Sequence, residues 1–264
     1  MIKKYAALLS YAGTNYCGWQ SQNRDGAPRE EGLPSIQETI RAALARMTGE
    51  STTIVGSGRT DAGVHAMGQL AHFVLRKKEW EAEILFKGLN SVLPADIRVL
   101  SVNPVPIEFH AQHSALKKQY SYYFQQGSSA LPHLAPYSRW IKKKLDLEAM
   151  NQALGHLIGE HDFLPFRASG AKPGPSVRTI FEAEAVLEPL SFPGGAEDFG
   201  LVRVRLLGSG FLKQMVRGIA GTLLQVGEGR RDPSCIRDIL ASGDRKTVGP
   251  TAPARALWLE RVWY

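Results

Sequence analysis

The sequence predicts an α+β fold with mostly antiparallel β-sheets. Strand and helix patterns follow one another along the 264 residues without the regular β-α alternation of a doubly wound fold. The chain also lacks the GxGxxG and GxxxxGK[ST] patterns that indicate a nucleotide cofactor. A repeated strand-and-helix layout indicates two similar domains, which we place at residues 1–110 and 111–264.

The N-terminal half contains four predicted strands and two predicted helices. Ser35 and Glu38 have the spacing of a capping box, so a helix should begin directly after Ser35. Its apolar residues repeat at helical period: Ile36, Ile40, Leu44 and Met47. A polar, glycine-bearing loop at 23–34 precedes this helix. We predict strands at 5–11, 52–55, 70–75 and 97–102, and a second helix at 81–92.

The C-terminal half continues the mixture of strands and helices. The stretch KKQYSYYF at 117–124 has the aromatic and β-favouring content of a strand. Asp146 can cap a helix that runs to about residue 157. Residues 211–227 predict a helix whose apolar stripe holds Leu212, Met215, Ile219, Leu223 and Val226. We predict further strands at 177–187, 201–207 and 257–263, and a short helix at 233–240.

The composition indicates a folded protein with an anionic partner. There are 32 Lys and Arg against 25 Asp and Glu, a formal net charge of +7. Nucleic acid is the first candidate, although many soluble proteins are mildly basic. Cys17 and Cys235 have no CxxC spacing, which disfavours a disulfide scaffold or a cysteine-based zinc site and fits a reducing cytoplasm. No apolar stretch approaches the roughly 20 residues of a membrane span.

The segment SGRTDAGVHAMG, at 57–68, places a cation, a carboxylate and an imidazole in one glycine-flanked turn. Arg59 can pair with Asp61 and keep it ionised, because a nearby cation lowers the pKa of an acid. An ionised aspartate on a rigid turn suits a nucleophile or a base. Three interpretations stay open: a catalytic aspartate, a solvated surface turn, and a metal site on Asp61 and His65 that lacks an obvious third ligand.

A second group of residues combines aromatic rings with cations. Tyr120 and Tyr122 alternate on the predicted strand and so face the same side, while Lys118 could contact phosphate. Aromatic faces that stack on unpaired bases beside cations are typical of RNA recognition. A core strand with lysines at its solvated end explains this stretch equally well.

Arg217 lies in the apolar helix at 211–227, close to its main stripe. It is either a snorkelling edge residue or a charge directed into a cleft. The basic runs at 76–78, 142–144 and 230–231 are typical of solvated faces, and together they could also line a phosphate-binding surface.

Several motifs, in order, resemble the TruA family of tRNA pseudouridine synthases. GRTDAGVHA at 58–66 resembles the family signature around its catalytic aspartate. The other landmarks cover nearly the whole chain: YAGTNYCGWQSQ, SIQETIRAAL, LNSVLPADI, FHAQHSA with KKQYSYYF, VRTI, FLKQMVRGIAGTLLQVGEGR and APARALWL.

The resemblance implies isomerisation of uridine to pseudouridine in the anticodon stem–loop of tRNA, at positions 38 to 40, without metal or organic cofactor. The N1–C1′ bond breaks, the detached uracil turns, and C5 bonds to C1′. The implied fold has two α+β domains that meet at a central basic active-site cleft. The implied protein is a cytoplasmic homodimer that binds tRNA and no membrane.

The same resemblance implies roles for individual residues. Asp61 matches the catalytic aspartate, and Arg59 and Arg217 are suited to supply positive charge beside it. Tyr120 matches an active-site tyrosine that can stack on the uracil, and Leu257 matches an apolar residue that packs against the target base. Both residues serve a nucleotide that must leave its stack and enter a pocket.

The chain departs from the family pattern at several positions. Gln112, Gln214, Gly218 and Ala256 stand where arginine, histidine, asparagine and glycine are common, and the loop at 23–34 is longer than usual. Asp61, Tyr120 and Arg217 are all present. Two other functions compete with the synthase: a noncatalytic tRNA-binding or tRNA-folding protein, and a metal-dependent hydrolase built on Asp61 and His65.

Overall fold

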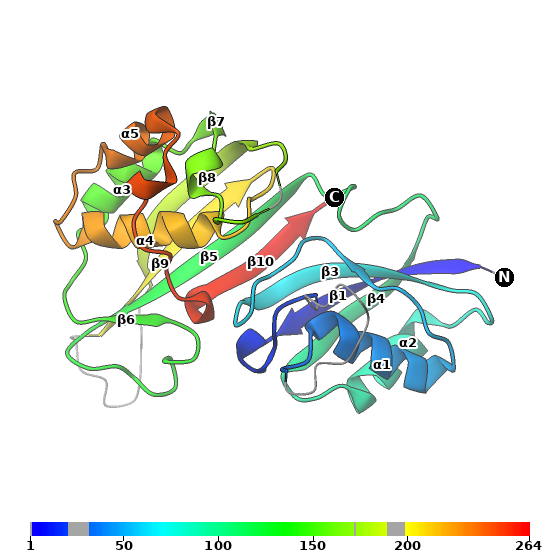
Figure 1. Ribbon diagram of the computed structural model, residues 1–264. Helices are drawn as coiled ribbons and strands as arrows, with labels where there is room; N and C mark the ends of the chain where they lie inside the picture. The colour runs from blue at the N-terminus through cyan, green and yellow to red at the C-terminus, as the bar shows by residue number, and fades with distance from the viewer. Residues whose placement is uncertain (1, 21–31, 172, 189–198) are drawn as a thin grey trace. The chain divides into compact units, whose positions relative to one another are not determined.

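The computed structural model describes residues 2–20, 32–171, 173–188 and 199–264. Over these ranges the chain forms an α+β fold with mostly antiparallel strand pairing, as predicted (Figure 1). It divides into two compact units. The first unit is Met1–Leu116 with Leu259–Tyr264, and the second is Lys117–Trp258. The division therefore falls six residues after our predicted boundary at 110, and the C-terminal segment returns to the first unit.

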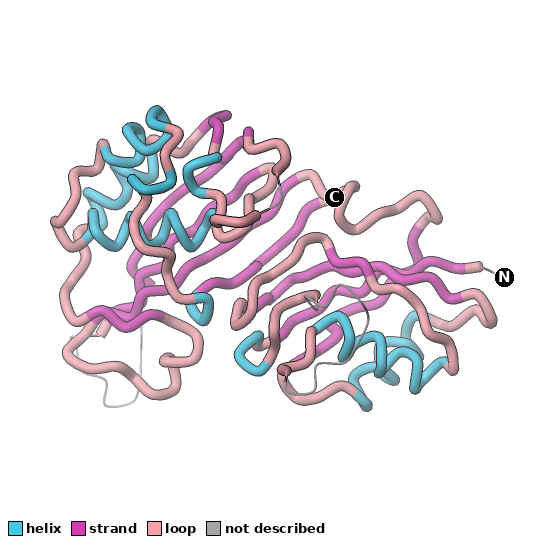
Figure 2. Tube along the Cα trace, viewed as in Figure 1, coloured by secondary structure: helices cyan, strands magenta, loops and turns pink. Residues whose placement is uncertain are grey.

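The first unit is an antiparallel sheet with two helices. Strand β1 (Lys3–Tyr11) pairs with both β3 (His65–Leu75) and β4 (Ile97–Val105), and the short strand β2 (Val55–Gly56) pairs with β3. The helices are α1 (Ile36–Thr48) and α2 (Ala82–Val92), which lie together beside the sheet (Figure 2). Their buried faces meet buried sheet residues to form the core: Tyr5, Leu9, Ile36, Leu44, Phe73, Leu75, Leu85 and Leu89.

Local sequence explains where α1 begins and ends. The predicted capping box is present, because Ser35 Oγ accepts a hydrogen bond from the Glu38 backbone N–H at 3.1 Å and Glu38 accepts one from the Ser35 N–H at 3.2 Å. Gly49 ends the helix at φ 68°, a left-handed conformation that favours glycine. Of the loop predicted at 23–34, residues 23–31 lie outside the described residues.

Two strand predictions in the first unit were wrong in extent. The strand predicted at 52–55 is reduced to Val55–Gly56. The strand predicted at 70–75 begins at His65, inside the motif. Gly68 concealed this longer strand, since glycine normally disfavours strands. A Cβ there would lie 2.4 Å from the Glu260 carbonyl oxygen, so the close approach of the C-terminal strand requires glycine.

The strands of the second unit pair mostly antiparallel and are accompanied by three described helices. Strand β5 (Lys117–Gln126) pairs with β9 (Gly200–Gly208), β9 with β8 (Val177–Glu188), and β8 with β7 (Gly159–Asp162). The short strand β6 (Arg139–Ile141) pairs in parallel with β5. The helices are α3 (Leu147–Gly155), α4 (Met215–Gly227) and α5 (Cys235–Ser242). Strand β10 (Leu257–Trp263) begins in this unit and ends in the first.

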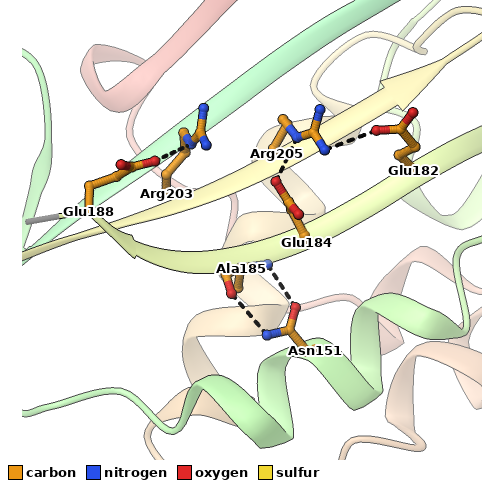
Figure 3. A network of polar contacts seen from close by, with 7 residues as sticks. All are labelled: Asn151, Glu182, Glu184, Ala185, Glu188, Arg203 and Arg205. Carbon is orange, nitrogen blue, oxygen red and sulfur yellow. Dashed lines mark hydrogen bonds and ion pairs between the residues drawn. The ribbon is translucent and has the colours of Figure 1, made fainter.

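The two faces of the strands in the second unit differ in polarity. Tyr122 and Phe124 of β5 lie opposite Val204 and Val202 of β9, and all four side chains are fully buried. The alternate residues of β9 and β8 carry charges. Arg203 pairs with Glu188, and Arg205 pairs with both Glu182 and Glu184 (Figure 3).

The side chain of Asn151 links helix α3 to β8 (Figure 3). Asn151 Nδ2 donates to the Ala185 carbonyl at 2.9 Å, and Asn151 Oδ1 accepts from the Ala185 N–H at 2.8 Å. The amide thereby completes the backbone hydrogen bonding of Ala185. The predicted N-cap of α3 is confirmed, because the Asp146 carboxylate accepts a hydrogen bond from the Ala149 N–H.

Helix α4 begins later than predicted. The expected helix at 211–227 starts at Met215, because Gln214 adopts a left-handed conformation with φ 61°. Leu212 therefore lies outside the helical stripe to which we assigned it. Strands β6 and β7 were not predicted, since they are only three and four residues long and lack apolar alternation. None of the described helices combines the length and the apolar character needed to cross a bilayer.

Candidate active site

The motif at 57–68 forms a turn whose backbone is held from both sides. Asp61 makes an isolated antiparallel bridge with Gly18, and the Trp19 N–H donates to the Thr60 carbonyl at 3.0 Å. The Val64 N–H donates back to the Asp61 carbonyl at 3.1 Å. The Asp61 side chain is half-buried, so its carboxylate sits on a fixed turn with part of its surface accessible.

Glycines in a distant motif make this arrangement possible. A Cβ on Gly18, which has φ 107°, would lie 2.6 Å from the Thr60 carbonyl oxygen. A Cβ on Gly13 would lie 2.0 Å from the Val64 carbonyl oxygen. Backbone packs directly on backbone here, which physically links the segments YAGTNYCGW and GRTDAGVHA.

Side chains beside Asp61 anchor the turn to the core. The Thr60 and Tyr11 hydroxyls share a buried hydrogen bond of 2.8 Å. Burial raises the pKa of Tyr11 to about 12, so this phenol stays protonated at neutral pH. Gln69 Nε2 donates to the Gly58 carbonyl at 2.8 Å, and its Oε1 accepts from Ser57. These bonds hold the turn on both sides of Asp61.

His65 has a structural contact. It is completely buried, and its Nδ1 accepts the Gly13 N–H at 3.0 Å. That nitrogen is therefore engaged with backbone and cannot also bind a metal. Among the residues that the structure describes, no group of three or more His, Cys, Asp or Glu side chains is placed to hold a metal ion. The absence of metal and cofactor from the reaction stays a prediction.

Arg59 lies on the exposed side of the turn. The ion pair that we predicted between Arg59 and Asp61 stays a prediction.

Lys118 and Tyr120 are neighbours on one face of β5 in the second unit. Tyr120 is 8% exposed and meets the Phe211 ring edge-on, with 5.1 Å between ring centroids. Burial, and then the nearby positive charge of Arg178, lower the pKa of Lys118. The two side chains combine a mostly covered aromatic ring with a partly desolvated cation.

Arg217 occupies the first turn of α4 and is fastened to one residue of a neighbouring segment. Its Nε donates to the Ala252 carbonyl at 2.8 Å, and the Ala252 N–H donates to the Arg217 carbonyl at 3.0 Å. Gly221 permits this contact, since a Cβ there would lie only 1.7 Å from the Pro250 carbonyl oxygen. Leu257, 6% exposed, begins β10 a few residues after Ala252.

The sequence reasoning missed two cations beside Tyr122. Its hydroxyl donates to the Pro253 carbonyl at 3.0 Å. Burial raises the pKa of Tyr122, while Arg139, Arg217 and Arg255 act in the opposite direction. Arg255 falls within the APARALWL landmark, but Arg139 lies in the three-residue strand β6 and carried no sequence signal. The predicted site residues thus divide between the units, with Arg59 and Asp61 in the first and Lys118, Tyr120, Arg217 and Leu257 in the second.

Comparison with known proteins identifies relatives along the whole chain. A family model described as tRNA pseudouridine synthase matches residues 7–114 and 153–264. Proteins named tRNA pseudouridine synthase A are similar to this chain over most or all of its length. The one from Syntrophotalea carbinolica is 42% identical, with 97% of this chain and 94% of the relative covered. The one from Geotalea uraniireducens is 39% identical over all of both chains, and the one from Maridesulfovibrio salexigens is 37% identical over 100% of this chain and 91% of the relative.

A solved structure described as a dye-decolorizing protein from V. cholerae matches with a TM-score of 0.18 and 12% identity over 87% of each chain. A similarity this low carries no information about the fold.

Proposed function

The chain belongs to the tRNA pseudouridine synthase family, and on this premise we propose that it isomerises uridine to pseudouridine in tRNA with Asp61 as its catalytic carboxylate. The observation that carries the assignment of Asp61 is the turn itself. Its backbone is held by Gly18, Trp19 and Val64, and the family model covers the whole segment. A carboxylate carried on a backbone that is fixed before substrate arrives needs less ordering in the reaction.

The reaction rearranges one nucleotide without adding or removing atoms overall. The N1–C1′ bond breaks, the C5–C1′ bond forms, and the proton lost from C5 is balanced by one gained at nitrogen. No electrons are transferred to another molecule, so the chemistry requires no redox cofactor. An ionised Asp61 serves each route by which the glycosidic bond can be opened, either as a nucleophile or as a base.

The proposed roles of the other residues follow from their charge and surroundings. Arg217, held in place by Ala252, and Arg59 supply positive charge to the negatively charged nucleotide. Tyr120 and Leu257 contribute apolar surface against the uracil, and Lys118 contacts phosphate. Tyr120 is mostly covered by Phe211 and its strand neighbours, so it presents only a small part of its surface to a base.

The finer features of the proposal rest on the family and on charge. We place the modified uridines in the anticodon stem–loop, the tRNA in a basic cleft, and the enzyme in the cytoplasm as a homodimer. The net charge of +7 supports binding to an RNA backbone.

The test compares the wild type with Asp61→Ala and Asp61→Asn on unmodified tRNA transcripts, mapping pseudouridine at each position. Glu83→Gln is the matched control, since it removes an exposed carboxylate that pairs with Lys87 on α2 of the same unit. We expect both Asp61 variants to lose at least about a hundredfold in rate. We expect Glu83→Gln to retain the wild-type rate.

Equal product from Asp61→Ala would refute the catalytic assignment. Binding of tRNA by the wild type without product would favour the noncatalytic alternative, and loss of activity with a chelator would favour the metal-dependent one. Pseudouridine mapped outside the anticodon stem–loop would contradict the proposed position.

A further inference from the structure

A cationic pocket lies at the C-terminal end of α4, entirely within the second unit. Its volume is about 320 Å³, and it is lined by Gln225, by Arg230 and Arg231, and by residues 246–250. Three of its lining side chains are cations, namely Arg230, Arg231 and Lys246, and none of its lining residues is acidic. A small, polar, positive pocket of this kind matches the charge and hydrogen-bonding needs of a phosphate group.

Arg231 is already positioned at the wall of this pocket. Its Nη2 donates to the Thr247 carbonyl at 2.7 Å, and its Nη1 donates to Gln225 Oε1 at 3.4 Å. A guanidinium carries five N–H donors, so Arg231 can keep these two bonds and still donate to a phosphate oxygen. Holding the side chain in advance reduces the entropy that binding would cost.

The carboxylates near the pocket already have hydrogen-bond donors. Glu228 pairs with Arg230. Asp232 accepts from the Ser234 N–H at 2.8 Å, and Asp244 accepts from the Lys246 N–H at the same distance. Glu228 therefore offsets part of the charge of Arg230, while Asp232 and Asp244 are directed toward backbone N–H groups.

Capping of α4 does not explain the exposed cations. The carbonyls of its last turn accept backbone N–H groups: Leu224 from Glu228, Gln225 from Arg230, Val226 from Gly229 and Gly227 from Asp146. Arg230 and Lys246 are exposed, and their side chains are not needed to satisfy these carbonyls. Their positions suit an external anion better than the helix end.

The pocket is joined to Arg217 by hydrogen bonds and close packing within the same unit. The segment from Thr247 to Ala252 runs along α4. The Gly249 N–H donates to Thr222 Oγ1 at 3.0 Å, and the Ala252 backbone is bonded to Arg217. Eight residues separate Arg217 from Gln225, which corresponds to about 12 Å along a helix. One RNA strand can span that distance within a few nucleotides.

We propose that this pocket binds a backbone phosphate of the tRNA, close in sequence to the nucleotide that Arg217 contacts. The identity of the RNA rests on the proposed function, whereas the binding of a phosphate rests on the pocket. A bound phosphate would receive donors from Arg230, Arg231 and Lys246, and Glu228 would compete with it for Arg230.

The experiment measures tRNA affinity in an Asp61→Asn background, so that binding is separated from turnover. Arg230→Gln combined with Lys246→Gln removes the two exposed cations and spares Arg231, which has structural bonds. We expect affinity for an unmodified transcript to fall by about tenfold, the effect of losing charged hydrogen bonds. The slope of log affinity against log salt should decrease by about one.

Two further variants make the test directional. Glu228→Gln removes a neighbouring negative charge, so it should strengthen binding by about twofold to threefold at low salt. Arg237→Gln is the matched control, because Arg237 is an exposed arginine of α5 paired with Asp238 outside the pocket. It should leave affinity and salt slope unchanged, and thermal unfolding should confirm that every variant is folded.

Unchanged affinity in the double variant, an unchanged salt slope, or weaker binding by Glu228→Gln would each overturn the proposal. Inorganic phosphate is tested separately by thermal shift. The pocket would be assigned to a free anion instead if the melting-temperature shift with phosphate depends on Arg230 and Lys246 but the tRNA affinity does not. Failure of the wild type to form pseudouridine would refute the proposed function and leave this binding result standing.

Discussion

Gly221 is the residue whose replacement tests the packing around Arg217 most directly. In Gly221→Ala the new Cβ would lie 1.7 Å from the Pro250 carbonyl oxygen, whereas real Cβ atoms stay beyond 3.0 Å. The segment must therefore move by at least about 1.3 Å, because the obstacle is backbone and cannot rotate away. The movement separates Ala252 from Arg217 and breaks the two hydrogen bonds between them.

The expected loss of stability combines three terms. Overpacking costs about 1–3 kcal/mol. The two lost hydrogen bonds cost about 1 kcal/mol each. Alanine returns about 1 kcal/mol through its higher helix propensity. The net destabilisation is then about 2–4 kcal/mol, which corresponds to a fall in Tm of roughly 5–15 °C.

Gly155→Ala provides the matched control for this substitution. Gly155 is also a helical glycine of the second unit, but nothing lies within 4 Å of a Cβ built on it. We expect Gly155→Ala to raise the free energy of unfolding by about 0.4–1 kcal/mol. Differential scanning calorimetry measures both variants, and a Gly221→Ala melting temperature within about a degree of the wild type would refute the packing argument.

Two further predictions concern the first unit. Burial, aided by the positive charges of His110 and Lys4, lowers the pKa of His72 to about 4. Between about pH 6.5 and pH 4 the unfolded chain therefore binds a proton that the folded chain does not. As the pH is lowered through this window, the free energy of unfolding should decrease by at most about 1.4 kcal/mol per pH unit. His72→Asn, whose Oδ1 can replace Nδ1 as acceptor of the Ala111 N–H, should flatten this dependence in urea titrations, and an unchanged slope would contradict the assignment. Tyr11→Phe removes the buried bond to Thr60 and should lower the free energy of unfolding by about 1–3 kcal/mol, with a smaller further loss on adding Thr60→Val. Purely additive losses in the double variant would show that the two hydroxyls do not interact.

Local chemistry predicted the elements whose signals are strong and short-range. The capping box of Ser35 and Glu38, the cap at Asp146 and the aromatic strand beginning at Lys117 all appear where the sequence indicated. The predictions were wrong where a distant contact or an unusual backbone conformation overrides local propensity. Gly68 is accepted within β3 because β10 approaches closely, and Gln214 delays α4 through a left-handed backbone.

The sequence by itself determined the α+β class, the family and the residue at the centre of the proposed reaction, Asp61. These depend on periodicity and on ordered motifs, which are properties of neighbours along the chain. Only the tertiary structure decided how that residue is held. It showed Gly13 and Gly18 packed against the turn, His65 bonded to backbone, and Arg217 joined to Ala252. Such contacts join segments far apart in sequence, and no local pattern records which backbone atoms they bring together.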